Sequence, residues 1–409
     1  MTGKGIAVAG FIRHDLDMRR LTLLLSALIV SPALAAPPAT VRVDFDARRI
    51  TPVIVEGAAN KESNRAVTID DPVRIASVSK HYVALGVMRL VDQGTLDLDR
   101  DISGYLGWKL RNPSFPDAPI TLRLLLSHQS SVSDGADYLI PVDQTVRAKL
   151  ADPKAWDTKH APGSGWFHYT NLNFPIVASV MEAATGERFD RLMDRTVMKP
   201  LKLNACFNWS LCSDAQAARA ITLYRATGEV ARDDLKGKLP PCPGVSGADG
   251  ACDLTRYTLG WNGAIFSPQG GLRVSARDLA KTGQMMIRGG KGFLKPASFV
   301  DLIKPQWRFD GRNGLGENGL AEDGFFCAYG LAVQTIGNGG ADCKDDGFGD
   351  GRERIGHAGE AYGLKSGLWV DRKASKGTAF FTTAVAEDST RGTSSFYAVE
   401  ESILKRRPH

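Results

Sequence analysis

The sequence predicts an α+β fold, in which an antiparallel sheet is formed by both chain ends with flanking helices, and a mostly helical lobe is inserted between them. Three observations lead to this prediction. Apolar residues alternate near the start of the chain, a pair of strands is expected near its end, and helical periodicity dominates between them. With 43% hydrophobic residues, the 409-residue chain also has enough apolar side chains for a large core.

Residues 1–35 are predicted to be a signal peptide. Arg19 and Arg20 precede an apolar run that ends in small residues at Ala33–Ala35, which is the pattern of a secretory signal. The run is too short to span a bilayer, and no cysteine lies near the expected cleavage point to accept a lipid. Translation starts either at Met1 or at Met18. We therefore expect a periplasmic or secreted protein without a stable membrane anchor, whose folded domain is residues 36–409.

Charge and cysteine content narrow the possible partners. Without residues 1–35 the chain has 47 Lys and Arg against 43 Asp and Glu, a net charge of +4, and no basic run is interleaved with aromatic residues, so we do not expect nucleic-acid binding. An even number of cysteines in an exported chain indicates disulfides. Proximity in sequence favours three pairs, although other pairings stay open: Cys206–Cys212, Cys242–Cys252 and Cys327–Cys343. No motif has metal-ligand spacing, so no metal and no other cofactor is expected.

The strands are predicted from alternation and turn residues. Val41–Gly57 alternates like one half-buried strand at an edge of the sheet, followed by a turn. Ser366–Ala386 reads as two strands joined by the polar turn Asp371–Gly377. Gly311–Gly351 is dense in Gly, Asn and Asp, so we expect a long surface loop closed by a disulfide.

The helices are predicted from apolar periodicity and end signals. Asn173–Thr185 is followed by Gly186, and Ser275–Arg288 is followed by a glycine pair, as expected at helix C-termini. These helices belong to the inserted lobe, which we place roughly at residues 112–290.

The segment RIASVSK, Arg74–Lys80, places a serine where an extended stretch gives way to a helix. At a helix N-terminus, the free N–H groups and the helix dipole favour negative charge on the Ser77 oxygen. Lys80 lies one turn later on the same face, within hydrogen-bond reach, and a lysine shielded from water can act as a base. The alternative is a serine N-cap followed by a solvated lysine. A second Ser-x-x-Lys, Ser402–Lys405, lies too near the C-terminus to be surrounded by a site.

Two further motifs supply partners for this pair. Tyr169-Thr170-Asn171 precedes a helix, and its phenol can relay a proton while its amide binds a carbonyl. Its alternative is a packed tyrosine followed by an asparagine cap. His357-Ala358-Gly359 comes just before the C-terminal strands, although a lone histidine is more often structural. Lys281-Thr282-Gly283 is set aside because its backbone donors are used within a predicted helix.

Taken in order, these three motifs resemble those of the serine beta-lactamase and penicillin-binding superfamily, specifically its class C branch. The similarity covers nearly the whole exported chain. Four connecting stretches also look like landmarks of that family: GTLDLDRDISGYL, ITLRLLLSHQSSVSDG, YTNLNFPIVASVMEAATGE and GGLRVSARDLAKTG.

The resemblance implies an α/β lobe beside a helical lobe, with the pocket between them, and acyl transfer through a serine ester. It implies that Ser77 is the nucleophile, that Lys80 and Tyr169 share the proton transfers, and that Asn171 orients the acyl side chain. It further implies an oxyanion hole made by the N–H groups of Ser77 and Glu360, the residue after Gly359. His357 would support the proton network.

The chain departs from the family pattern at two places. Ala358 stands where lactamases carry a hydroxyl residue that helps to hold a substrate carboxylate, and Arg354 or Lys365 could fill that gap. Ser131 stands where relatives often have glycine. We therefore expect a serine hydrolase acting on a small-molecule or peptide substrate, either a small ester or a D-amino-acid peptide. A beta-lactamase and a non-catalytic envelope binding protein are the alternatives, and the sequence does not determine the oligomeric state.

Overall fold

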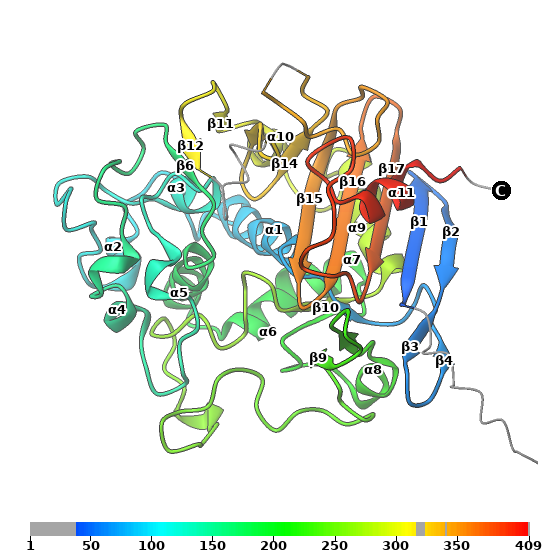
Figure 1. The fold of residues 1–409 in the computed structure, drawn as a ribbon. Coiled ribbons are helices and arrows are strands. Elements are labelled where there is room, and N and C mark those ends of the chain that lie inside the picture. The colour runs from blue at the N-terminus through cyan, green and yellow to red at the C-terminus, as the bar shows by residue number, and fades with distance from the viewer. Residues whose placement is uncertain (1–37, 316–323, 340–341, 408–409) are drawn as a thin grey trace, which may run out of the picture. The chain divides into compact units, whose positions relative to one another are not determined.

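The computed structural model describes residues 38–315, 324–339 and 342–407. The predicted signal peptide therefore lies outside the described residues. Within them, one antiparallel sheet of eight strands carries the strands from both ends of the domain (Figure 1). In sheet order its strands are β11 (Trp307–Arg308), β13 (Ala328–Tyr329), β14 (Gln334–Ile336), β15 (Arg354–Ala361), β16 (Leu364–Asp371), β17 (Lys376–Thr382), β1 (Thr40–Asp46) and β2 (Ile50–Glu56). The pairing of β1 with β17 confirms the predicted sheet and the fold class.

Helices lie between and after these strands in the described sequence. The α-helices are α1 (Val78–Asp92), α2 (Ser103–Leu106), α3 (Leu122–Leu126), α4 (Val146–Lys149), α5 (Asn173–Thr185), α6 (Phe189–Met193), α7 (Lys199–Leu201), α8 (Asp214–Arg219), α9 (Ala276–Ile287), α10 (Pro296–Ile303) and α11 (Ala398–Lys405). Short helical turns are η1 (Asp134–Ala136), η2 (Pro153–Ala155), η3 (Asp194–Met198) and η4 (Leu254–Arg256). Both helices predicted in the central region are present, as α5 and α9, and Ser275 caps α9 by accepting a hydrogen bond from the Asp278 N–H.

Short strands outside the large sheet tie loops together. They are β5 (Val73–Arg74), β10 (Leu272–Val274) and β7 (Cys206–Phe207) in one sheet, and the pairs β12 (Gly314–Leu315) with β6 (Phe167–His168), β3 (Ala58–Asn60) with β4 (Arg65–Ala66), and β8 (Leu223–Tyr224) with β9 (Val230–Arg232). The sheet that contains β5 holds the extended segment directly before the candidate nucleophile.

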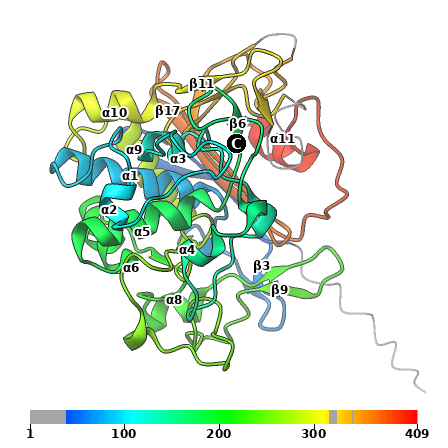
Figure 2. The same cartoon turned by 90° about the vertical axis from the view of Figure 1, so that its left-hand side faces the viewer.

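The large sheet is buried on both faces. α9 packs on one face, where a Cβ added to Gly283 would lie only 2.1 Å from the Phe45 ring. α11 lies on the opposite face, as the two views show (Figures 1 and 2), and its Ile403 and Leu404 join a core with Trp369 and Phe380. Because both faces are covered, every residue of β16 is buried.

Two predicted elements differ in the structure. Val41–Gly57 is a hairpin of β1 and β2 and not one strand, because the Asp46 carboxylate accepts hydrogen bonds from the N–H groups of Arg48 and Arg49 and so stabilises a turn. The segment Gly311–Gly351 is also not simply a surface loop. Its described part includes β13 and β14, because the apolar run Phe325–Ile336 is buried between polar flanks.

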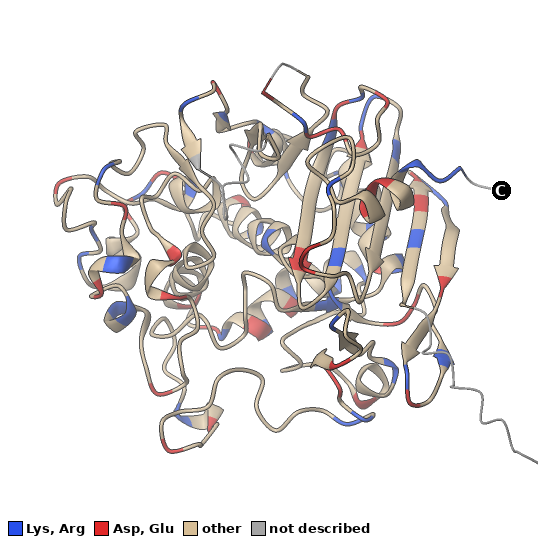
Figure 3. Ribbon diagram, in the orientation of Figure 1, with Lys and Arg blue, Asp and Glu red and all other residues tan. Residues whose placement is uncertain are grey.

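All three favoured disulfides are present, joining Cys206 to Cys212, Cys242 to Cys252 and Cys327 to Cys343. Charged residues of both signs are interspersed along the strands, helices and loops (Figure 3). No helix in the described ranges has the length and hydropathy of a membrane span.

Candidate active site

Ser77 stands immediately before α1, but it does not cap the helix. Its side chain accepts no hydrogen bond from the backbone of the first turn. The preceding residue, Ala76, has a φ of 47°, and this left-handed conformation turns the chain sharply from β5 into α1. The hydroxyl of Ser77 instead forms a hydrogen bond with Lys80, which is fully buried. The alternative of a serine cap followed by a solvated lysine does not fit this geometry.

Lys80 connects three elements of the site. Its Nζ lies 2.9 Å from Ser77 Oγ, 2.7 Å from Asn171 Oδ1 and 3.1 Å from the Gln269 carbonyl oxygen. The oxygens of Asn171 and Gln269 can only accept hydrogen bonds, so each binds one N–H of Lys80 in either protonation state. The Ser77 hydroxyl can accept a hydrogen bond when Lys80 is an ammonium and donate one when Lys80 is a neutral amine. The same arrangement therefore fits both protonation states of the lysine, as a group that takes and returns a proton requires.

Tyr169 lies beside this pair, after β6. Its ring is packed between His128, at a centroid distance of 4.4 Å, and Phe326, at 5.0 Å. The Lys80 Nζ is 4.7 Å from the centroid of the same ring. Tyr169 and Ser77 line a common cavity of about 180 Å³, which we call the second cavity. The structure thus brings Tyr169 to the same site as Ser77 and Lys80.

Asn171 is held by a carboxylate that was not among the predicted site residues. Asp134 Oδ2 accepts hydrogen bonds from the backbone N–H and the side-chain amide of Asn171, while Oδ1 accepts from the N–H of Leu172. With the amide N–H taken by Asp134, the Asn171 oxygen faces Lys80. Asp134 lies in the stretch ITLRLLLSHQSSVSDG, and the similarity of this stretch to the family is the sequence signal that could have indicated it.

His128 fixes the rest of the Tyr169 motif. Its Nδ1 accepts a hydrogen bond from the Thr170 N–H at 3.0 Å, and its carbonyl oxygen accepts from the His168 N–H at 2.9 Å. Burial and the nearby Lys80 hold the pKa of His128 well below its usual value, so the imidazole is a neutral packing and hydrogen-bonding group.

His357 lies on β15 and faces the site from the sheet. Its Nε2 and the Tyr329 hydroxyl are 2.7 Å apart, and its Nδ1 is 2.5 Å from the Ala358 carbonyl oxygen. Burial and then the Lys80 charge lower the pKa of His357 to about 3, so the ring is neutral near neutral pH. With Nδ1–H donating to the carbonyl, Nε2 accepts from Tyr329, whose own pKa is raised by burial. Its ring centroid is 6.2 Å from that of Tyr169.

Gly359 allows β15 to pack closely against the N-terminus of α1. A Cβ at this position would lie 2.3 Å from the Ile75 carbonyl oxygen and 2.4 Å from Ser366 Oγ. Ser366 in turn donates a hydrogen bond of 2.9 Å to the same carbonyl of Ile75. The backbone of Gly359 and Glu360 is therefore held next to the start of α1, where the helix N–H groups have no partner within the helix.

Glu360 and Lys365 form an ion pair on the rim of the second cavity. Of the two cations that could replace the missing hydroxyl at Ala358, Lys365 lines this cavity. Arg354 instead makes a bidentate ion pair with Asp350 and does not line it.

The C-terminal segment also contributes residues to the second cavity, and none of them was among the predicted site residues. Arg391, Tyr397 and Glu400 line it, and the Tyr397 ring lies 3.5 Å from Lys365 Nζ and 4.0 Å from Arg391 Cζ, measured to its centroid. No sequence pattern indicated these three residues, because none of them belongs to a recognised motif and the Ser-x-x-Lys of this segment, Ser402–Lys405, does not include them.

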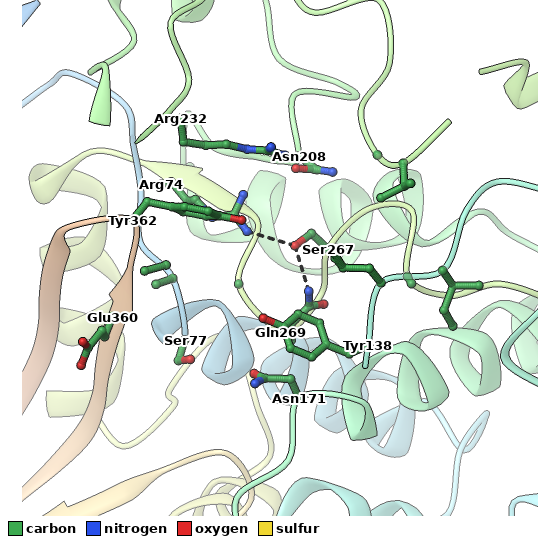
Figure 4. A pocket seen from close by; sticks show the side chains of 18 residues that line it. Arg74, Ser77, Tyr138, Asn171, Asn208, Arg232, Ser267, Gln269, Glu360 and Tyr362 are labelled. Carbon is green, nitrogen blue, oxygen red and sulfur yellow. Dashed lines mark hydrogen bonds between the residues drawn. The ribbon is translucent and has the colours of Figure 1, made fainter. Parts of the chain in front are cut away.

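Another cavity, of about 300 Å³, opens on the other side of Ser77, and we call it the first cavity (Figure 4). Ser77 and Glu360 line both cavities. Asn171 and Gln269 line the first cavity only, and Tyr169 and His357 line the second only. Lys281-Thr282-Gly283 lies within α9 and lines neither.

Ser131 has a φ of 59°, in the region that favours glycine. Its hydroxyl accepts a hydrogen bond from the Asn112 amide at 2.9 Å, which compensates part of the backbone strain.

The model of the family described as Beta-lactamase matches residues 40–399. The chain belongs to this family. The resemblance inferred from the three motifs is thereby confirmed.

Among curated proteins of the family, esterase EstB from Burkholderia gladioli is 31% identical over 270 residues, which are 61% of this chain and 65% of EstB. The D-alanyl-D-alanine-carboxypeptidase/endopeptidase AmpH from Escherichia coli K12 is 29% identical over 158 residues, or 36% of this chain and 39% of AmpH. The matched region thus spans less than two thirds of either relative. An octameric penicillin-binding protein homologue from Pyrococcus abyssi has a similar fold, with a TM-score of 0.63 at 19% identity over 91% of this chain and 74% of that protein.

Proposed function

We propose that this chain is an exported serine hydrolase that cleaves an ester or amide through an acyl-enzyme. The observation that supports this best is the hydrogen bond between Ser77 and the buried Lys80, made by a serine that caps no helix N–H. A serine used only for capping would not need a buried amine one turn later. The two cavities that meet at Ser77 provide space for the two parts of a substrate.

In the first half of the reaction, Ser77 Oγ attacks the substrate carbonyl carbon and its proton passes to Lys80 Nζ. The N–H groups of Ser77 and Glu360 stabilise the oxyanion that forms. The bond to the leaving group then breaks, and the leaving group takes a proton that Tyr169 relays from Lys80. Asn171 orients the acyl side chain, and the neutral His357 packs beside Tyr169 to support this network.

In the second half, water attacks the acyl carbon and passes its proton to the Tyr169 and Lys80 pair. The ester bond to Ser77 breaks, and Ser77 Oγ regains a proton. Because the leaving group is protonated from Tyr169, it occupies the second cavity, and the acyl group occupies the first cavity beside Asn171.

We propose a small ester or a D-amino-acid peptide as the substrate class. The esterase and D-alanyl-D-alanine-carboxypeptidase names of the relatives support these two classes. Ala358 removes the hydroxyl that would hold the carboxylate of a beta-lactam, so we rank a beta-lactamase second and a non-catalytic envelope binding protein third.

We further propose that residues 1–35 direct export to the periplasm or the outside of the cell. Residues 36–409 then form the hydrolase domain, with its helical lobe roughly at 112–290. The three disulfides support this location, because they persist in oxidising compartments.

The central test compares the wild type with Ser77→Ala, using a fluorophosphonate probe and a chromogenic ester. We expect labelling and turnover in the wild type and neither in the variant. Ser402→Ala is the matched control, because it removes the exposed serine of the second Ser-x-x-Lys motif and should behave like the wild type. Equal activity of Ser77→Ala and wild type would refute the nucleophile.

A nitrocefin assay separates the alternatives. Fast turnover would support the beta-lactamase, whereas slow acylation of Ser77 without release would support the esterase or peptidase. If no probe acylates Ser77, a binding protein becomes the better description.

A further inference from the structure

The first cavity is lined by two arginines, the buried Arg74 and the exposed Arg232. Their Cζ atoms lie 5.1 Å and 5.7 Å from the centroid of the Tyr362 ring. Figure 4 shows the three side chains together on the far side of the cavity from Asn171. Among the described residues, neither arginine forms an ion pair with a carboxylate.

Arg74 has guanidinium N–H groups that form no hydrogen bond within the described residues. Only 6% of the residue is exposed. Its Nη2 donates to Ser267 Oγ at 3.3 Å, while Nε and Nη1 are buried without a protein partner. An unpaired buried donor is costly, and more so on a charged group, so these donors are expected to have a ligand in the working protein.

The neighbours of Arg74 increase this cost. Arg74 on β5 is paired in register with Arg273 on β10, and like charges placed opposite each other destabilise a sheet. Asp233 compensates Arg273 through an ion pair of 2.6 Å. The Asp233 charge also acts to raise the pKa of Arg74, but Asp233 does not line the cavity. Glu360, which lines the cavity, is paired with Lys365. Burial and Arg273 lower the pKa of Arg74 to about 10, which leaves it protonated at neutral pH.

We propose that Arg74 and Arg232 form an anion subsite that selects substrates whose acyl group ends in a carboxylate. This inference rests on the proposed function, because it places the acyl group in the first cavity next to Asn171. The substrate class is then a monoester or monoamide of a dicarboxylic acid. Water adds across the ester or amide bond, which releases the free dicarboxylate and an alcohol or amine.

The test uses mono-4-nitrophenyl esters of adipic and suberic acid, each compared with the same compound whose free carboxylate is methylated. The wild type should hydrolyse at least one free acid with a kcat/KM about 10-fold or more above that of its methylated partner, the range that a charge-assisted hydrogen bond contributes. The preference should shrink at high salt because it is electrostatic. Absence of any preference in the wild type would overturn the proposal.

Variants of the two arginines test whether these residues cause the preference for the free acid. Arg74→Gln and the surface variant Arg232→Gln should each reduce the ratio of the two kcat/KM values, and Arg74→Lys should retain part of it because the charge remains. The methylated ester reports general damage to the fold, since it lacks the charge. Arg308→Gln removes an exposed arginine that lines neither cavity and should leave the ratio unchanged.

If Ser77-dependent turnover persists but no arginine variant changes the ratio, this inference fails while the proposed function stands. If Ser77→Ala is as active as the wild type, the proposed function fails first.

Discussion

Asp134 binds Asn171 twice, accepting a hydrogen bond of 2.8 Å from its backbone N–H and one of 3.0 Å from its side-chain amide. This pair of bonds determines which end of the amide meets Lys80. The Asn171 oxygen, 2.7 Å from Lys80 Nζ, is the acceptor that keeps the amine in place beside Ser77. Asp134 therefore positions the site without touching the reacting atoms.

Replacing Asp134 by Ala should reduce kcat/KM for a chromogenic ester by roughly 10- to 100-fold, because a misplacement of about 1 Å at a reacting group has an effect of this size. Asp134→Asn should be intermediate, since it keeps one acceptor oxygen. The measurement is a set of steady-state rates with the fold checked by circular dichroism.

Asp152→Ala is a suitable control for this prediction. Asp152 also accepts a backbone hydrogen bond, from Lys154, but it precedes η2 and lines neither cavity. If Asp134→Asn were no better than Asp134→Ala, or if both matched the Asp152 control, the positioning role would be wrong.

Gly359→Ala should move β15 away from the N-terminus of α1. The new Cβ would meet the Ile75 carbonyl oxygen at 2.3 Å, and an overpacked contact of this kind destabilises a protein by about 1–3 kcal/mol. We expect a lower melting temperature and a larger loss of kcat than of substrate affinity, because the Glu360 N–H moves. In the control Gly104→Ala, the three atoms nearest to the added Cβ belong to the flexible Arg100 side chain. Equal effects of the two substitutions would contradict the prediction.

The sequence predicted the parts of this molecule whose signals are local. The α5 boundaries follow from periodicity and from Gly186, which adopts the left-handed conformation that ends the helix. Ser77 and Lys80 were found because a serine and a lysine one turn apart at a helix start define their own geometry. The hairpin β1–β2 was missed because its turn depends on the Asp46 side chain, a signal weaker than the alternation around it.

The remainder of the site depends on contacts between distant parts of the chain. Gln269 contributes only its carbonyl oxygen to Lys80, so its side chain carries no information about that role. Tyr397 and Glu400 reach the second cavity because α11 packs across the sheet. Such contributions follow from the tertiary structure, and a pattern in one sequence does not reveal them.

His357 should not control the pH dependence of the reaction. Its pKa is lowered to about 3 by burial and by Lys80, so its imidazole stays neutral over the range of about pH 5 to 8 in which an ordinary histidine titrates. We expect His357→Gln to lower kcat/KM while the shape of its pH profile stays that of the wild type. Tyr329→Phe, which removes the hydroxyl at Nε2, is the companion variant and should also preserve the shape. A limb near the ordinary histidine pKa that disappears in His357→Gln would contradict this expectation.

Glu400 should make the folded state less stable as the pH rises. Burial raises its pKa to about 7, whereas an unfolded glutamate titrates at 4.5. Between these values the folded protein keeps a proton that the unfolded chain has released, so the free energy of unfolding falls as the pH increases through this window. Glu400→Gln removes the titration and should be more stable than the wild type at pH 8 by on the order of 2 kcal/mol, with little difference at pH 5.

Glu401, the next residue, should have the opposite effect on the pH dependence of stability. Hydrogen bonds from Lys405 and Ser394 outweigh its desolvation and lower its pKa to about 2. Glu401→Gln should therefore be less stable than the wild type at pH 8, and the difference should shrink as the pH falls through the pKa of Glu401. Denaturant unfolding of the three proteins at pH 8 and pH 5 measures the Glu400 difference, and a further measurement at about pH 3 follows the loss of the Glu401 contribution. A Glu400→Gln variant that gains no stability at pH 8 relative to pH 5 would show that the fold does not raise the pKa of this carboxyl.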